Sequence, residues 1–151
     1  MSSLRILLVG IIIFNSAAVS AQEISLIGHG FSYHLQNSNK VNQDNYGLGI
    51  RLDYSNFGIQ GGSYINSYSN QSNYLLLDIN LIDYKTDIIR VEAGPMVAIA
   101  SGYPDYSPIG VGIQAAIHYD NFFMRVRALP AVNSVAVGAI EIGLRVFKWH
   151  S

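Results

Sequence analysis

Apolar and polar positions alternate along most of the chain beyond residue 22, as they do in β-strands, and no stretch there has the spacing of an amphipathic helix. Runs of about ten residues rich in Ile, Val, Leu, Tyr and Phe are separated by clusters of Asn, Ser, Asp, Gly and Pro. These runs predict eight strands, at residues 23–35, 46–54, 57–66, 74–83, 88–100, 109–119, 122–129 and 135–147. An even number of strands of about 9 to 11 residues is typical of a small membrane barrel.

The connectors between these runs alternate in length. Residues 36–45, 67–73 and 101–108 form long connectors, whereas 55–56, 84–87 and 120–121 are short and 130–134 is intermediate. Outer-membrane barrels have tight turns on the periplasmic side and longer loops outside. If both termini are periplasmic, every longer connector lies outside. The pattern therefore predicts a closed, antiparallel, up-and-down, eight-stranded transmembrane β-barrel.

Charged residues occupy the positions between the apolar ones. In the run 74–83, Leu75 and Leu77 would face lipid, while Asp78 and Asn80 would face the lumen. Five basic and four acidic residues fall at lumen positions and nearly cancel: Arg51, Asp53, Asp78, Arg90, Glu92, Arg125, Arg127, Glu141 and Arg145. An eight-stranded barrel is just wide enough to be filled by its own side chains. We therefore expect a network of ion pairs inside the barrel, and no channel.

The first 21 residues have the three parts of a secretory signal, namely Arg5, an apolar run at 6–14, and small residues ending at Ala21. The apolar run is about half the roughly 20 residues that a membrane-spanning helix needs. We expect a signal peptide at 1–21 and a single barrel domain at 22–151. The chain has no cysteine, which excludes a lipidated cysteine, disulfides and thiolate metal sites.

Composition supports a membrane location. Only 13% of the residues are charged and 50% are apolar, about half the charged share of a soluble domain. Without Arg5, eight Lys and Arg face ten Asp and Glu, a formal charge of −2, which argues against nucleic acid as a partner. We expect a monomer in the bacterial outer membrane, with outer-membrane lipid, including lipopolysaccharide, and the barrel-assembly machinery as partners.

Ten tyrosines lie mostly near the ends of the predicted strands, where amphipathic rings suit the membrane interface. Phe147 and Trp149 end the last strand close to the terminal aromatic residue that barrel assembly favours. The segment Tyr103–Tyr106, with Pro108, predicts a turn, although an aromatic loop there could also contact lipopolysaccharide sugars.

One set of outer-side residues carries a resemblance. His34, the segments 42–45 and 47–49, Asn66-Ser67 and 72–74 look like a group of small uncharacterised barrels from bacteria and tailed phages. More loosely, they resemble two lipid A-modifying outer-membrane enzymes, the palmitoyltransferase and the 3-O-deacylase. The deacylase pattern implies a serine two residues after the histidine, where this chain has Gln36, and the palmitoyltransferase pattern implies an Asp-Ser pair, which this chain lacks.

The same residues form a candidate site for acyl transfer, which needs a hydroxyl nucleophile, a base and an acid that orients the base. His34 would be the base, Asp44 its orienting acid, and Ser67 or Ser72 the hydroxyl, because the end of the first strand and the first two outer loops are neighbours in a meander. Alternatively, these Asn, Ser and Asp residues are ordinary loop formers.

His29 and His118 are expected in the lumen, and the four scattered histidines predict neither a metal site nor a cofactor. Three functions remain open. The first is a non-enzymatic outer-membrane barrel with a structural or surface-binding role. The second is a lipid A deacylase or acyltransferase. The third is a soluble exported barrel with a small ligand inside, which the charged lumen positions disfavour.

Overall fold

The computed structural model describes residues 22–34, 42–103, 109–129 and 137–149. The predicted signal peptide, Leu35, Tyr106 and Pro108 lie outside these ranges. The strands are β1 (Glu23–His34), β2 (Asp44–Asp53), β3 (Phe57–Ile65), β4 (Gln71–Ile79), β5 (Ile82–Lys85), β6 (Ile89–Ala100), β7 (Ile109–Tyr119), β8 (Phe122–Leu129) and β9 (Val137–Lys148). No helix in the described part is long and apolar enough to cross a bilayer.

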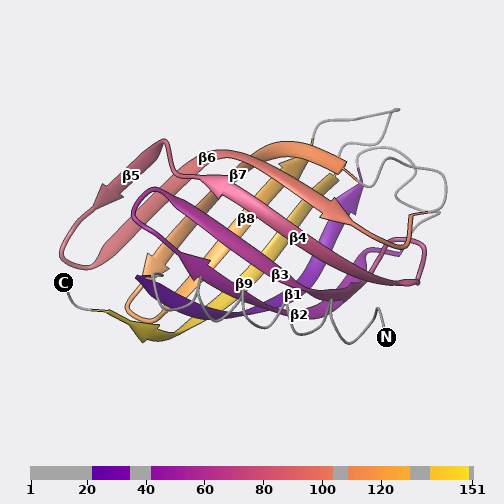
Figure 1. Ribbon diagram of the computed structural model, residues 1–151, viewed down its shortest axis with the longest axis horizontal. Coiled ribbons are helices and arrows are strands. Elements are labelled where there is room, and N and C mark those ends of the chain that lie inside the picture. Colours follow the sequence, from indigo (N-terminus) through magenta and orange to yellow (C-terminus); the bar gives the residue numbers. More distant parts are fainter. Residues whose placement is uncertain (1–21, 35–41, 104–108, 130–136, 150–151) are drawn as a thin grey trace, which may run out of the picture.

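The strands form one closed antiparallel barrel (Figure 1). Each strand pairs with its neighbour in the chain except β4 with β5, and two further pairings, β1 with β9 and β4 with β6, close the wall. Because β4 and β5 follow one another along the same edge of β6, they fill the place of one strand, and the barrel has eight spans. The predicted all-β barrel fold is therefore confirmed.

The predicted fourth strand is divided in two. Tyr74–Asp78 pairs with β6, but the pairing resumes only at Ile82. Pro95 lies on β6 opposite this break, and proline has no N–H to donate to a strand ladder. Gly94 lies against the Ile79 carbonyl, where a side chain would not fit. The hairpin of β5 and β6 therefore projects beyond the barrel at one end (Figure 1).

In the described residues, β5 pairs only with β6, so its other edge has no strand partner. Unpaired backbone groups are not tolerated in the hydrocarbon layer. We therefore place β5 and its turn outside the membrane-spanning part of the barrel.

Two strands begin earlier than predicted. β2 starts at Asp44 and β4 at Gln71. Residues 71–73 are polar, which favoured a loop in the sequence, but their backbones pair with β3 in regular register. The neighbouring strand, and not their side chains, makes these residues extended.

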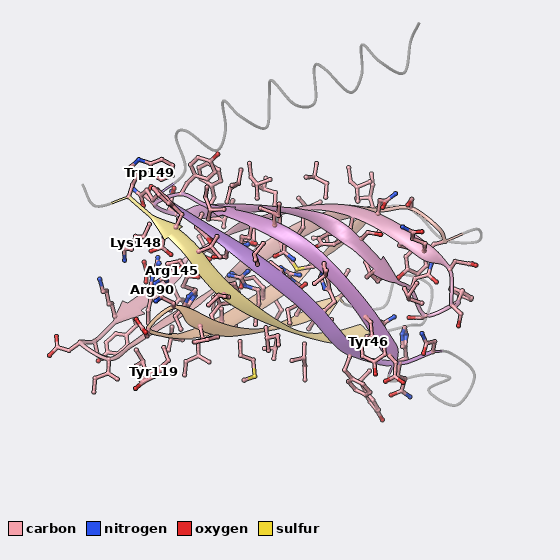
Figure 2. All side chains as sticks on the ribbon, turned by 90° about the horizontal axis from the view of Figure 1, so that it is seen from below. Tyr46, Arg90, Tyr119, Arg145, Lys148 and Trp149 are labelled. Carbon is pink, nitrogen blue, oxygen red and sulfur yellow. The ribbon has the colours of Figure 1, made fainter. Side chains whose placement is uncertain are left out.

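Side chains alternate between the two faces of the wall, as predicted for β4. Leu75 and Leu77 are exposed on the outer face, while Asp78 is completely buried and Asn80 nearly so. The outer face of the other spans is also apolar, with Ile113, Ile117, Met124 and other large apolar side chains exposed (Figure 2). A broad apolar outer face around a polar interior is typical of a membrane barrel, and it disfavours the soluble alternative.

A β-bulge in β1 changes which side chains face inward. Against β9, His29 pairs with Glu141 and Phe31 with Ile140, so Gly30 between them is an extra residue of β1. A bulge reverses the in-and-out alternation after it. Phe31 and Tyr33 are consequently exposed, and Ser32 and His34 are buried.

Candidate functional site

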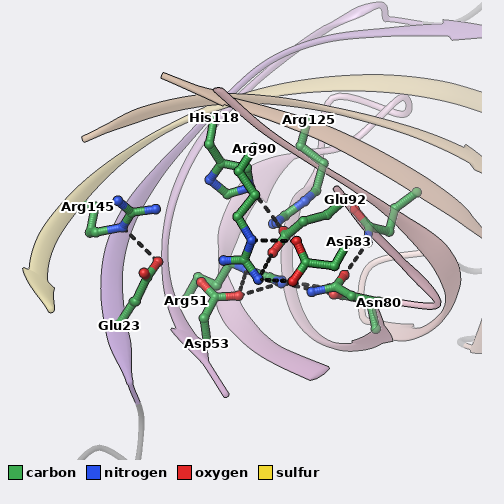
Figure 3. A network of polar contacts seen from close by, with 12 residues as sticks. Glu23, Arg51, Asp53, Asn80, Asp83, Arg90, Glu92, His118, Arg125 and Arg145 are labelled. Atoms are coloured by element: carbon green, nitrogen blue, oxygen red, sulfur yellow. Dashed lines mark hydrogen bonds and ion pairs between the residues drawn. The ribbon is translucent and has the colours of Figure 1, made fainter. Parts of the chain in front are cut away.

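The lumen contains a cluster of buried charges at the end of the barrel where β1 begins and β9 ends (Figure 3). Arg51, which has no exposed surface, donates two hydrogen bonds to the Asp78 carboxylate, from Nη1 to Oδ2 at 2.6 Å and from Nη2 to Oδ1 at 2.9 Å. Its Nε donates to Asp53 Oδ1 at 2.7 Å. Both acids are therefore neutralised by the same guanidinium group, in the planar geometry that arginine favours.

A second group of charges surrounds Glu92. Arg90 Nη2 lies 2.7 Å from Glu92 Oε1, and His118 Nε2 lies 3.0 Å from Oε2. Arg125 is the exception in this group. Its nearest carboxylate oxygen is Glu92 Oε2, at 3.7 Å from Nη2, and none of its three side-chain nitrogens has a hydrogen-bond partner among the described residues. Its guanidinium instead lies 5.0 Å from the centre of the Phe123 ring.

A third group lies nearer the middle of the barrel. Arg127 Nη1 contacts Glu141, and Glu141 Oε1 also lies 3.0 Å from His29 Nδ1. His29 Nε2 lies 2.7 Å from the Tyr74 hydroxyl, which accepts a hydrogen bond from Gln60 Nε2 at 2.8 Å. A neutral imidazole with its proton on Nδ1 satisfies all of these contacts.

The predicted lumen charges all come from inward-facing positions, but one member of the network was missed. Glu23 is buried, and its carboxylate lies 2.7 Å from Arg145 Nε and 3.2 Å from Lys148 Nζ. With Glu23, five acidic residues accompany the five lumen arginines. Glu23 is the second residue after the expected cleavage site and the first of the predicted strand 23–35, where no preceding alternation indicates which face it occupies.

Beyond these charges, part of the lumen is filled by aromatic and apolar side chains. Tyr74, Leu76 and Met96 form a buried cluster against which Tyr64 and Leu129 pack. Tyr64 and Tyr74 therefore lie inside the barrel, and not at the membrane interface predicted for most of the tyrosines. The Tyr64 hydroxyl lies 2.9 Å from the hydroxyl of Tyr103, in the described part of the third outer loop. Burial raises the pKa of Tyr103 above its ordinary value, and the neighbouring Tyr64 adds to the shift.

The rim of the barrel at the end of β1, which the connector lengths predict to be the outer rim, holds a buried histidine and serine in direct contact. His34, the last residue of β1, places Nε2 at 2.6 Å from the Ser67 hydroxyl oxygen. The Ser32 hydroxyl lies 3.4 Å from the same nitrogen and donates to Asn45 Oδ1. Nδ1 of His34 is buried and has no hydrogen-bond partner in the described residues. A serine hydroxyl within hydrogen-bond reach of an imidazole is the core of a nucleophile and base pair.

The other two predicted site residues are not brought to His34. Asp44 is exposed and pairs across the strands with Phe31, and Asn45 takes the inward position next to it. Ser72 is buried, but its hydroxyl donates to the Ser101 carbonyl at 2.5 Å and accepts from Asn66 Nδ2 at 2.9 Å. The alternation along β2 explains the placement of Asp44, because Asn45 and the odd-numbered residues that follow it, as far as Arg51, face inward, which turns Asp44 outward.

Asn66 organises the turn that carries Ser67. Its side-chain oxygen accepts hydrogen bonds from the backbone N–H groups of Tyr68 at 2.9 Å and Asn70 at 3.0 Å. Its side-chain nitrogen donates to the Gly102 carbonyl at 2.8 Å, so the turn is tied to the third outer loop. Ser69 adopts a left-handed conformation with φ of 60°, which this short turn requires.

Metal binding has no candidate in the described residues, since no group of three His, Asp or Glu side chains is placed to hold an ion. Neither His29 nor His118 lies in such a group. Their ring nitrogens instead lie 3.0 Å from the lumen carboxylates of Glu141 and Glu92.

Comparisons with known proteins identify the fold. A de novo designed transmembrane β-barrel superposes with a TM-score of 0.54 at 15% sequence identity, covering 83% of this chain and 97% of the design. Ail, the attachment invasion locus protein of Yersinia pestis, superposes with a TM-score of 0.46 at 15% identity, covering 82% of this chain and 97% of Ail. No family model and no curated protein matches the sequence.

The closed wall, the apolar outer face and the likeness to the designed barrel define the class of protein. The chain is an integral membrane β-barrel with eight antiparallel spans.

Proposed function

We propose that this chain is an outer-membrane barrel whose lumen is closed by its own side chains and whose outer end carries a structural or surface-binding role. The observation that carries the proposal is the buried ion network, in which Arg51 contacts Asp53 and Asp78 and Arg127 contacts Glu141. Paired and hydrogen-bonded charges in the interior hold side chains in place and leave no row of free charges to line a water-filled pore.

The alternation of short and long connectors supports the outer membrane as the location, with the termini in the periplasm. Outer-leaflet lipid, including lipopolysaccharide, would be the partner at the outer end, and the barrel-assembly machinery would insert the chain.

Cell fractionation and electrical recording test this proposal. The full chain is expressed with its N-terminal segment, and outer membranes are compared on gels with and without boiling. A band that shifts on boiling is expected, because a folded barrel resists detergent until heated. The purified barrel in planar bilayers is expected to show no steady ion conductance. A soluble, unshifted band would refute the location, and a stable open conductance would refute the closed lumen.

A second candidate function is hydrolysis or transfer of an acyl chain on outer-leaflet lipid. The observation that favours it is the 2.6 Å contact between His34 Nε2 and the Ser67 hydroxyl at the rim. In that reaction Ser67 Oγ attacks the ester carbonyl while His34 takes the hydroxyl proton, and His34 then protonates the departing alcohol. Water or a second alcohol releases the acyl group from Ser67.

This candidate predicts a change in lipid A mass in cells that express the chain. The change is expected to disappear in both His34→Ala and Ser67→Ala, and to persist in Ser72→Ala, whose hydroxyl is tied to the Ser101 carbonyl. Heat-shifted bands for all three variants would show that they fold. An unchanged lipid A mass in cells expressing the native chain would refute the enzyme and leave the surface-binding role.

A further inference from the structure

The lipid-facing wall carries an apolar groove. This groove of about 560 Å³ crosses five adjacent strands, from β2 through β1, β9 and β8 to β7. Its lining is apolar throughout most of its area, and its outward-facing members include Leu26, Leu48, Phe122, Met124, Ile142 and Leu144.

Gly28 creates the hollow. It lies on the outer face of β1, opposite Leu48 on β2 and Ile142 on β9. The side chains of Leu48 and Ile142 are 77% and 66% exposed and form the two sides of the groove beside Gly28. A Cβ atom at Gly28 would meet Ile142 at 3.5 Å, an ordinary contact, so the position has room for a side chain that the sequence does not supply.

The groove has a direction within the membrane. At one end, Tyr119 and Phe122 flank the short turn between β7 and β8, which lies on the same side of the barrel as the termini. At the other end, Leu48 is in the middle of β2. A tyrosine at a strand end is typical of the headgroup interface. The groove therefore runs from the interface toward the middle of the bilayer, the course of a lipid chain.

A second copy of the chain fits this surface poorly. Two copies related by a two-fold axis at Gly28 would place hollow against hollow, since such contacts use the same patch on both partners. The resulting void would forfeit the van der Waals contacts that drive association in a bilayer. A flexible hydrocarbon chain has no such restriction.

We propose that this groove binds one acyl chain of a diacyl glycerophospholipid from the leaflet on the side of the termini, and holds it more tightly than the surrounding lipid. The tyrosine hydroxyl of Tyr119, whose side chain is exposed at the mouth of the groove, lies where it can reach the glycerol ester or headgroup. This binding is independent of any activity at the outer rim.

Native mass spectrometry of the full barrel, released from detergent that contains palmitoyl-oleoyl phosphatidylethanolamine, tests the proposal. The native chain is expected to retain one lipid molecule. Gly28→Leu fills the groove and is expected to lower the occupancy about tenfold, because van der Waals contacts with the chain are lost. The matched control is Gly61→Leu, a glycine on the outer face of β3 that also has room for a Cβ atom and lies outside the groove.

A second pair of variants keeps the test decisive if Gly28→Leu does not fold. Leu48→Ala removes one side of the groove and is expected to weaken lipid retention, whereas Leu75→Ala, an exposed leucine on β4 outside the groove, is expected to leave retention unchanged. Equal occupancy in the native chain, Gly28→Leu and Leu48→Ala would overturn the proposal. So would a dimer that disappears in Gly28→Leu, because the groove would then be an interface between two copies.

Discussion

Two buried arginines in the lumen differ sharply in how they are paired, and this difference predicts opposite effects of the same substitution. Arg51 and Arg125 are both completely buried and both carry one positive charge. Arg51 makes three short contacts with Asp53 and Asp78, whereas Arg125 makes no hydrogen bond to a described residue. Replacing either residue by methionine removes the same charge and leaves a side chain of similar length.

Arg51→Met is expected to cost about 3 to 5 kcal/mol, the usual cost of removing one partner of a buried ion pair. Asp78 has no exposed surface and receives its described hydrogen bonds from Arg51 alone, so its carboxylate would be left buried and unpaired. Arg125→Met is expected to change the free energy of unfolding by about 1 kcal/mol or less, in either direction. The substitution removes the 3.7 Å ion pair with Glu92 and the contact with Phe123, which destabilises the fold. It also removes three buried nitrogens that have no hydrogen-bond partner among the described residues, which stabilises it.

Urea unfolding of the barrel refolded in lipid vesicles measures both changes. Fluorescence of Trp149, the one tryptophan of the chain, and loss of the gel shift on boiling report unfolding. The two variants are expected to differ by at least about 2 kcal/mol, roughly a 30-fold difference in the unfolding equilibrium. Equal destabilisation of both would refute the reasoning, because net charge in the lumen, and not hydrogen bonding, would then set the stability.

Three further predictions concern the ends of the barrel. Gly94→Ala is expected to lower the free energy of unfolding by about 1 to 3 kcal/mol and to broaden the unfolding transition, since the new methyl group would meet the backbone carbonyl of Ile79. An unchanged midpoint of unfolding in urea would contradict this. Asn66→Ala is expected to lower the free energy of unfolding by about 1 to 3 kcal/mol and to speed amide hydrogen exchange in the β3–β4 turn, because the partners of the Asn66 side chain lose their hydrogen bonds. Unchanged exchange would show that the turn does not depend on Asn66. Asp83 lies on the hairpin outside the membrane, and the hydrogen bonds from Arg90 lower its pKa. The ion pair between Asp83 and Arg90 therefore stabilises the hairpin fully above the ordinary pKa of Asp83, and this stabilisation is lost as the pH falls through the lowered pKa. Hydrogen-exchange protection in that hairpin, corrected for the pH dependence of the intrinsic exchange rate, is expected to fall with acidification in the native chain and to stay constant in Asp83→Asn, and equal profiles would refute the role of the pair.

The barrel wall was predictable because its physics is local. A strand with one face toward lipid and one toward the lumen must alternate in polarity, and the alternation can be read from Leu75, Leu77 and Asp78 without any knowledge of their neighbours in space. The same rule placed every predicted lumen charge at an inward position. Turn residues such as Asp120 and Asn121 marked the short connectors for equally local reasons.

The candidate site at the outer rim was only partly predictable. His34, Ser67 and Ser72 are all buried at the outer end, but only Ser67 contacts the histidine. Asp44 was chosen for its carboxylate, yet its position in β2 turns it outward. Whether Ser67 or Ser72 contacts His34 depends on the register of β3 against β4 and on the hydrogen bonds of the turn between them. The spacing of residues in the sequence does not reveal either of these.

The sequence by itself determined the number of spans, the face that most strand side chains meet, and the near balance of charge inside, because each follows from periodicity and composition along one strand. Only the tertiary structure decided which charges pair, that Gly30 is an extra residue that turns His34 inward, and that the fourth span breaks before β5. These features depend on contacts between strands that are far apart in the chain. A closed barrel fixes such contacts through its overall register, and no single strand encodes that register.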